Sequence, residues 1–182
     1  MRTLNKLVEC VYEDSKRHIL IPSSPDRVFE VVDDLGITGM HMTNSSAMMM
    51  GSKFHLQYLT ANHSGVNSRY RWTGKMMGLK MDFTVEVTKW TKGMEKIWET
   101  IGNARMIIYS WYQMRLMLSQ ADGKTNAELS ISYKRPKNLL ARFVAWLFAG
   151  WYCNWCLKKM LKDTKKQLEE TEHGTSSSHR VA

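Results

Sequence analysis

Apolar and polar side chains alternate along most of the chain between residues 47 and 135, and this pattern constrains the fold more than any other feature. In the segment KMDFTVEVTKW every second residue from Met81 to Val87 is apolar. Alternation of this kind predicts a strand with one apolar and one polar face. Similar segments follow one another through short turns such as TKG and ADGKTN. The sequence therefore predicts an antiparallel meander with one buried face and one face in water.

A strand and a short helix are predicted to precede the meander. Residues 9–21 end in an apolar, β-branched run that favours a strand, and Pro22 stops it. Ser24 suits the N-cap of a helix and Pro25 suits its first position. One face of this helix would carry Val28, Phe29, Val32 and Leu35. Residues 37–46 are ambiguous, and a second short helix is one interpretation.

A long C-terminal helix is predicted over residues 138–171, which contain no proline and a single glycine. A sheet with an apolar face must bury that face against another element, and only this helix is long enough. A chain of 182 residues suffices for one domain with its own core. We expect one α+β domain over residues 1–171, with a curved seven-stranded antiparallel sheet around the helix. The polar segment 172–182 is expected to be a disordered tail.

This order of elements resembles the helix-grip fold of the START/Bet v 1-like (SRPBCC) superfamily, which includes polyketide cyclase-like and coenzyme Q-binding relatives. The resemblance is carried by HILIPSSPDRVFEVVDDL, by RYRWTGKMMGLKMDFTVEV with the strands after it, and by the closing helix ARFVAWLFAGWYCNWCLKKMLKDTKKQLEE. It covers roughly residues 9–171. The superfamily has no shared catalytic motif, so the resemblance is specific for fold and weak for function. It implies a cavity between sheet and helix that takes lipids, sterols, polyketides or other apolar molecules.

We expect this protein to bind an apolar small molecule or lipid. Transport of that molecule is one form that this function would take. Twelve of the 14 methionines lie between Met40 and Met117. Their flexible thioether chains suit a cavity that accepts variable guests, although they would also serve to plug a filled core. The tyrosines among the expected lining residues would orient the ligand. The expected lining comprises Phe54, Tyr58, Tyr70, Trp72, Met81, Phe83, Tyr112, Met114, Leu116, Leu129, Ile131, Phe143, Trp146 and Gly150.

The closing helix is apolar on two sides in its first half. One stripe, which includes Phe143, Trp146, Cys153 and Leu157, is expected to pack on the sheet. The opposite side is expected to form an exposed aromatic patch followed by lysines, and comprises Phe148, Trp151, Tyr152, Trp155, Lys158, Lys159 and Lys162.

Three interpretations of this patch stay open. It would dock on an anionic membrane surface, bury itself in a homodimer, or be covered by residues 37–46. A membrane span is disfavoured, because the uncharged run from Phe143 to Leu157 has 15 residues and a spanning helix needs about 20.

No catalytic constellation, metal site or phosphate loop stands out in the sequence, and no cofactor is expected. Cys153 and Cys156 form a CNWC segment that we interpret as core packing, because neither a second pair nor a nearby histidine completes a zinc site. Glu99 would be a buried base if the face of Ile97 and Ile101 points inward, and a solvated carboxylate if it points outward. A polyketide cyclase or dehydrase-like enzyme, implied by the resemblance, is the second hypothesis. An interaction module that uses the aromatic patch is the third.

Basic residues outnumber acidic ones by 26 to 17, which gives a net charge of +9. Positive charge attracts anionic surfaces. Nucleic-acid binding is disfavoured, because Tyr109, Trp111 and Arg115 only vaguely match the exposed aromatic and basic pattern that it requires. The three cysteines form no disulfide framework, and charged residues interrupt the N-terminal segment. We therefore expect a cytoplasmic protein, membrane-peripheral if the patch docks on a bilayer.

Overall fold

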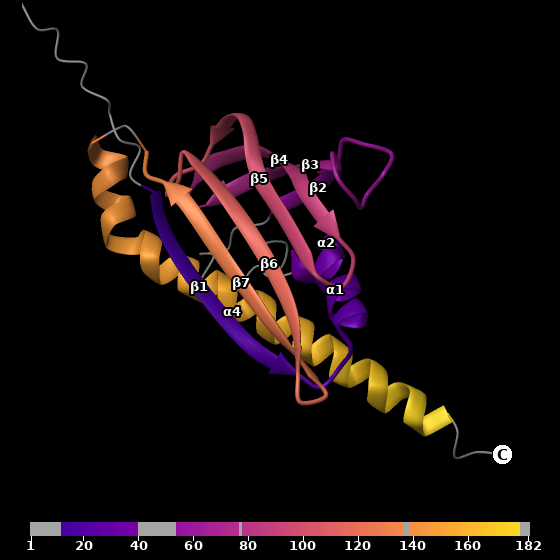
Figure 1. The fold of residues 1–182 in the computed structure, drawn as a ribbon. Coiled ribbons are helices and arrows are strands. Elements are labelled where there is room, and N and C mark those ends of the chain that lie inside the picture. Colours follow the sequence, from indigo (N-terminus) through magenta and orange to yellow (C-terminus); the bar gives the residue numbers. More distant parts are fainter. Residues whose placement is uncertain (1–11, 40–53, 77, 137–138, 179–182) are drawn as a thin grey trace, which may run out of the picture.

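A computed structural model of the chain describes residues 12–39, 54–76, 78–136 and 139–178. Strand β1 and the short helices α1 and α2 are followed by strands β2 to β7 and by the long helix α4 (Figure 1). The bounds are β1 Tyr12–Ile21, α1 Pro25–Asp33, α2 Leu35–Thr38, β2 Phe54–Tyr58, β3 Arg69–Met76, β4 Leu79–Thr91, β5 Glu95–Arg105, β6 Trp111–Ala121, β7 Lys124–Lys134 and α4 Leu139–Ser178.

The strands form one seven-stranded sheet in the order β1-β7-β6-β5-β4-β3-β2, and every neighbouring pair is antiparallel. Strands β2 to β7 follow one another as a meander, and β1 completes the sheet by pairing with β7. The pairing of β4 with β5 is irregular between Asp82 and Thr84 and between Val87 and Lys89. Irregularities of this kind bend and twist a strand. The predicted helix-grip fold is confirmed.

The alternation in the sequence becomes alternation of burial. Met81, Phe83, Val85 and Val87 of β4 are buried, and the residues between them are only partly covered. At the start of α1 the Ser24 hydroxyl accepts a hydrogen bond from the Arg27 amide at 3.5 Å. This helix buries Val28, Phe29 and Val32, the apolar face that its spacing predicts.

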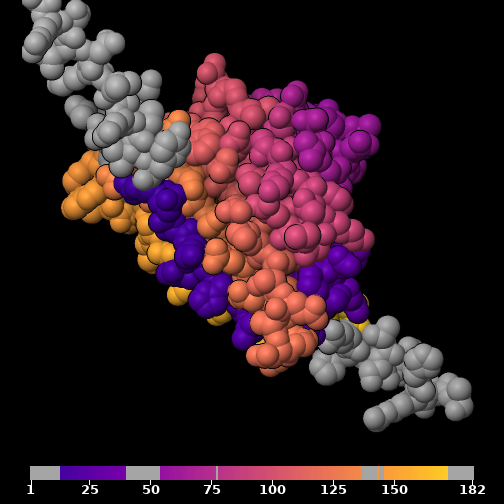
Figure 2. Space-filling model, viewed as in Figure 1, coloured from indigo at the N-terminus to yellow at the C-terminus, as the bar shows by residue number. Residues whose placement is uncertain are grey.

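Helix α4 lies across one face of the sheet, where it contacts β1, β7, α1 and α2 (Figure 1). In the space-filling view its atoms show beside β1, at the margin of the surface that the strands form (Figure 2). The helix continues to Ser178, beyond the predicted end at residue 171. Its buried apolar side chains are Ala149, Cys153, Leu157, Met160, Leu161 and Leu168.

Phe143 and Trp146 correct the expected packing stripe, because they are 58% and 62% exposed. Both precede Ala149, the first buried position among the described side chains of α4. Trp146 lies three residues before Ala149 and therefore on the same side of the helix, so the helical wheel gives its direction correctly. It does not show where along its length a helix begins to be covered.

Strand β6 begins at Trp111, whereas the apolar segment IIYSWYQMRLML predicts a long strand that starts at Ile107. Residues 106–110 form an irregular connection, in which Ile108 and Tyr109 are buried. This connection packs toward α4, since the Tyr109 and Tyr152 rings lie 6.5 Å apart. Tyr152 therefore lies on the covered side of the helix, and its expected place in the exposed patch is wrong.

Candidate functional site

A cavity of about 110 Å³ lies between the sheet, the two short helices and α4. This volume is of the order that accommodates a benzene-sized molecule, whereas pockets for drug-sized ligands measure roughly 300–1,000 Å³. The side chains around it are almost all apolar or aromatic. They are Val32, Leu35, Thr38, Phe54, Tyr70, Trp72, Met76, Met81, Phe83, Lys96, Trp98, Met106, Ile108, Tyr109, Tyr112, Met114, Ile131, Tyr152, Cys153, Cys156, Leu157 and Met160, together with Gly39.

Five methionines belong to this lining and come from β3, β4, β6, α4 and the connection before β6. Unbranched thioether chains change rotamer at low cost and repack around irregular shapes. A guest larger than benzene therefore fits if these side chains move. The five residues are Met76, Met81, Met106, Met114 and Met160.

Most of the predicted lining residues on the strands do face the cavity. These are Phe54, Tyr70, Trp72, Met81, Phe83, Tyr112, Met114 and Ile131. Leu116 and Leu129 are fully buried, but they belong to the packed core outside the cavity. Tyr58 is half-buried and stacks on His63, with ring centroids 3.9 Å apart.

The three lining residues predicted on α4 lie elsewhere. Phe143, Trp146 and Gly150 are exposed and outside the lining: the first two precede Ala149, where burial begins among the described side chains of α4, and Gly150 lies on the exposed side of the helix. The helix instead contributes Tyr152, Cys153 and Cys156 to the cavity.

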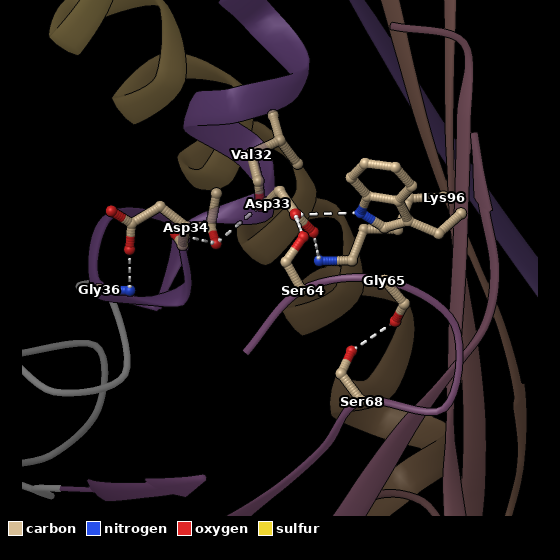
Figure 3. Close-up of polar contacts among 10 residues, drawn as sticks. Val32, Asp33, Asp34, Gly36, Ser64, Gly65, Ser68 and Lys96 are labelled. Atoms are coloured by element: carbon tan, nitrogen blue, oxygen red, sulfur yellow. Dashed lines mark hydrogen bonds and ion pairs between the residues drawn. The ribbon is translucent and has the colours of Figure 1, made fainter. Parts of the chain in front are cut away.

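Among the described residues of the lining, Lys96 of β5 is the charged one, and the others are apolar, aromatic or uncharged. It is 2% exposed, and its Nζ lies 2.6 Å from Oδ1 of Asp33, the last residue of α1 (Figure 3). The other carboxylate oxygen of Asp33 accepts hydrogen bonds from Ser64 Oγ at 2.5 Å and Trp90 Nε1 at 3.0 Å. The Lys96 ammonium also lies 5.1 Å from the centre of the Trp98 ring. The cavity wall thus contains a buried ion pair that joins α1 to the sheet.

The pKa values of the pair follow from burial and attraction. Burial lowers the pKa of Lys96, and the neighbouring Asp33 carboxylate opposes this shift. Burial raises the pKa of Asp33, but Lys96 and the hydrogen bonds from Ser64 and Trp90 outweigh it, so that this pKa lies below its usual value. Asp33 is ionised at neutral pH, and its negative charge opposes the loss of the Lys96 proton.

Sequence reasoning missed Lys96, although the segment EKIWETI contains the signal. Lys96, Trp98 and Thr100 share one face of β5, and that face is buried. Glu99 lies on the other face and accepts a hydrogen bond from Gln113 Nε2 at 2.7 Å. The solvent-facing alternative for Glu99 is therefore the one that the structure supports, and the inward-facing base is not.

The two cysteines of α4 are packing residues in the cavity wall, as the CNWC interpretation predicts. Cys153 is fully buried and its Sγ forms a hydrogen bond with the Tyr109 hydroxyl at 2.8 Å. Burial raises the pKa of Cys153 to about 11 and that of Cys156 to about 12. Both thiols are protonated at neutral pH, a state that is poor at nucleophilic and metal-binding chemistry. Within the described ranges no group of three histidine, cysteine or carboxylate side chains is placed to hold a metal ion.

A second notable surface lies on the first half of α4. Its exposed apolar side chains, called here the α4 aromatic surface, are Phe143, Trp146, Leu147, Phe148 and Trp151. Trp155, predicted to belong to the same patch, is half-buried and packs against the core. Lys158, Lys159 and Lys162 are exposed further along the helix.

Two other interpretations of this surface are a cover by residues 37–46 and a membrane span. The cover by residues 37–46 lies largely outside the described residues, which stop at residue 39 and resume at residue 54. For a span, none of the helices in the described ranges combines the length and apolar character that crossing a bilayer requires.

No protein-family model matches this chain, and no curated protein sequence matches it at a significant level. Solved structures do match. A Thermus thermophilus protein superposes with a TM-score of 0.65 at 15% identity, over 87% of this chain and 99% of its own. Norcoclaurine synthase from Thalictrum flavum, solved in complex with dopamine and hydroxybenzaldehyde, gives a TM-score of 0.63 at 14% identity, over 93% of this chain and 94% of its own. The Zhui aromatase/cyclase from a Streptomyces species gives a TM-score of 0.61 at 12% identity, over 87% of this chain and 96% of its own. This chain has the helix-grip fold of the START/Bet v 1-like (SRPBCC) proteins.

Proposed function

We propose that this protein binds an apolar small molecule or lipid in the cavity between its sheet and α4. The observation that carries this proposal is a continuous apolar and aromatic lining around free space, rather than a solidly packed interior. One fold neighbour, norcoclaurine synthase, was solved with small aromatic molecules bound, which supports the capacity of this architecture for such guests.

Binding of this kind is a partitioning process. A guest leaves water and gains roughly 25 cal/mol for each Å² of apolar surface that it buries, so that about 200 Å² contributes about 5 kcal/mol. The flexible methionines of the lining let the free space grow with the guest. Selectivity for shape is then modest, and the few polar groups of the wall decide orientation.

The test uses N-phenyl-1-naphthylamine, a neutral probe whose fluorescence rises in apolar surroundings. Cys156→Phe would fill the cavity from α4, and Lys158→Phe places the same side chain on the exposed side of the same helix. We expect the wild type and Lys158→Phe to bind the probe and Cys156→Phe to bind it at least about tenfold more weakly. Equal binding by all three proteins, or none by the wild type, would contradict the proposal.

We also propose that the α4 aromatic surface docks on an anionic membrane. Trp146 and Trp151 are 62% and 56% exposed, and such side chains favour the interfacial region of a bilayer. The exposed lysines that follow on the same helix are attracted to acidic head groups. Docking would bring one wall of the cavity close to the lipid from which a guest would come.

Vesicle sedimentation tests this docking. The double variant Trp146→Ser/Trp151→Ser is compared with Leu79→Ser/Met94→Ser, which removes two apolar side chains that are 57% and 63% exposed elsewhere. We expect the wild type and the second variant to bind phosphatidylserine-containing vesicles and the tryptophan variant to lose binding. A wild-type protein that ignores these vesicles and sediments as a dimer would instead assign the surface to self-association.

A further inference from the structure

The geometry points to Lys96 as the anchor of a ligand that carries an uncharged oxygen acceptor, such as the carbonyl of a ketone or aldehyde. This inference rests on the proposed function and names the chemical class of the guest. It assigns a polar end to a cavity whose other walls select only for apolar surface.

The first reason is the position of the amine. The Lys96 side chain is 3% exposed and belongs to the cavity lining, so a guest that fills the free space contacts this side chain. An ammonium has three N–H donors, and its contact among the described oxygen atoms is the one with Asp33 (Figure 3). N–H donors that Asp33 does not use favour an acceptor on the guest, because a buried donor without a partner is costly.

The second reason is that two tyrosine hydroxyl groups belong to the same cavity lining as Lys96. Tyr70 and Tyr112 line the same cavity, and within the described part of the chain no hydrogen bond uses either hydroxyl group. Burial raises the pKa of Tyr70, and Tyr112 and the charge of Asp33 raise it further. The Tyr112 pKa is also raised, chiefly by burial. Both phenols therefore stay protonated at neutral pH and offer donors within the same cavity.

The third reason concerns charge. Asp33 lies 2.6 Å from Lys96 and already balances its positive charge. A carboxylate guest would place two negative groups beside one ammonium in an apolar site, where repulsion is weakly screened. A neutral carbonyl accepts hydrogen bonds without disturbing the balance. The wall therefore favours an uncharged oxygen over an anion.

A purely structural role for the pair is the alternative, since it joins α1 to the sheet. Lys92 offers a matched control, because it pairs with Glu30 of the same helix at 2.8 Å and both side chains are more than half exposed. Lys92→Met and Lys96→Met each remove one ion pair that α1 makes with a lysine outside the helix. Only the second substitution removes a donor from the cavity.

The experiment uses three competitors that displace N-phenyl-1-naphthylamine: tetralin, 1-tetralone and 1,2,3,4-tetrahydro-1-naphthoate. Tetralone differs from tetralin by one carbonyl oxygen, and the naphthoate carries a negative charge. We expect the wild type and Lys92→Met to prefer tetralone over tetralin by about tenfold or more, and to bind the naphthoate more weakly than tetralone. Lys96→Met and Asp33→Asn/Lys96→Met should bind tetralin as the wild type does and lose the preference for tetralone. The double variant keeps the site neutral, so that it remains informative if Lys96→Met fails to fold.

The outcomes separate the two proposals. Equal affinity of the wild type for tetralin and tetralone, or an unchanged preference in the variants without Lys96, overturns the anchor and leaves apolar binding standing. Tighter binding of the naphthoate than of tetralone overturns the choice of an uncharged acceptor. Failure of the wild type to bind the probe, tetralin and tetralone removes the proposed function and the anchor with it.

Discussion

Lys96 is the residue whose surroundings depart most from what its type predicts. Lysine is almost never fully buried without a partner, and here Asp33 supplies one at 2.6 Å. Ser64 and Trp90 complete the shell of the carboxylate, so that residues from α1, β4, β5 and the β2–β3 connection converge on one point (Figure 3). Such a network restricts the position of the end of α1 relative to the sheet.

Substituting one member of the Asp33–Lys96 pair should destabilise the fold strongly, and substituting both should cost less than the sum of the two single changes. We expect Lys96→Met and Asp33→Asn each to lower the free energy of unfolding by about 3–5 kcal/mol, because each leaves an uncompensated buried group. The double variant should lose less than the sum of the two. Urea denaturation measures the three values, and strictly additive losses would contradict the coupling of the two side chains.

The thiols of Cys153 and Cys156 should react slowly in the native protein. Their pKa values of about 11 and about 12 leave on the order of one thiolate in a thousand or fewer at about pH 8. In a Cys10→Ser background we expect iodoacetamide to label neither cysteine at that pH until the protein is unfolded in urea. Mass spectrometry counts the adducts, and rapid labelling of the folded protein would refute the expected burial and protonation.

At the scale of elements, α4 has two halves with different roles. From Ala149 onward it closes the core and one wall of the cavity, and its earlier described side chains expose the α4 aromatic surface. The sheet pairs in regular register except between β4 and β5. Its bulges in the β4–β5 pairing and the connection over residues 106–110 both shape the region around the cavity.

The buried half of α4 should hold the helix to the sheet. Leu161 is 3% exposed and lies outside the cavity lining. Truncation in Leu161→Ala is therefore expected to cost about 2–5 kcal/mol, because it removes buried methyl groups and leaves a void. The adjacent exposed substitution Lys162→Ala should change stability by less than about 0.5 kcal/mol. Thermal or urea unfolding compares them, and similar values for both would place Leu161 outside the packed interface.

The whole molecule carries a net charge of +9, and several of its 17 acidic side chains pair with positive neighbours. Hydrogen bonds from Lys92 and Arg71 lower the pKa values of Glu30 and Asp82. A hydrogen bond from Lys89 does the same for Glu95, and burial only partly opposes it. Asp33 belongs to the same group. These pairs join separate elements across the surface and the edge of the core.

Acid should therefore destabilise the protein. Each of these carboxyl pKa values is lower in the folded state than its usual value of 3.8 or 4.5, so the unfolded chain binds more protons. The stability is present above about pH 4.5 and is lost as the pH falls through the folded-state values. We expect the melting temperature to fall steeply between about pH 5 and 3, and less steeply in Asp33→Asn. A flat profile over that range would contradict the assigned shifts.

The sequence by itself determined the sheet, the α1 face and the long helix. These depend on periods of two and 3.6 residues, which report local geometry and burial of one face. It also identified Tyr70, Trp72, Phe83 and Tyr112, because inward positions on a strand are set by alternation alone. In β5 the same alternation is ambiguous, because Trp98 favours one face as the buried face and Ile97 and Ile101 favour the other. The structure buries the face of Trp98, and Lys96 lies on it.

Only the tertiary structure decided which partners meet. Lys96 is stable inside because Asp33, distant in sequence, arrives from α1, and no local pattern encodes that encounter. The coverage of α4 likewise depends on where the sheet begins and on the connection that packs against Tyr152. Periodicity specifies which way a side chain points relative to its own element. What lies in that direction is set by the packing of other elements, and here that packing leaves a cavity with one buried ion pair in its wall.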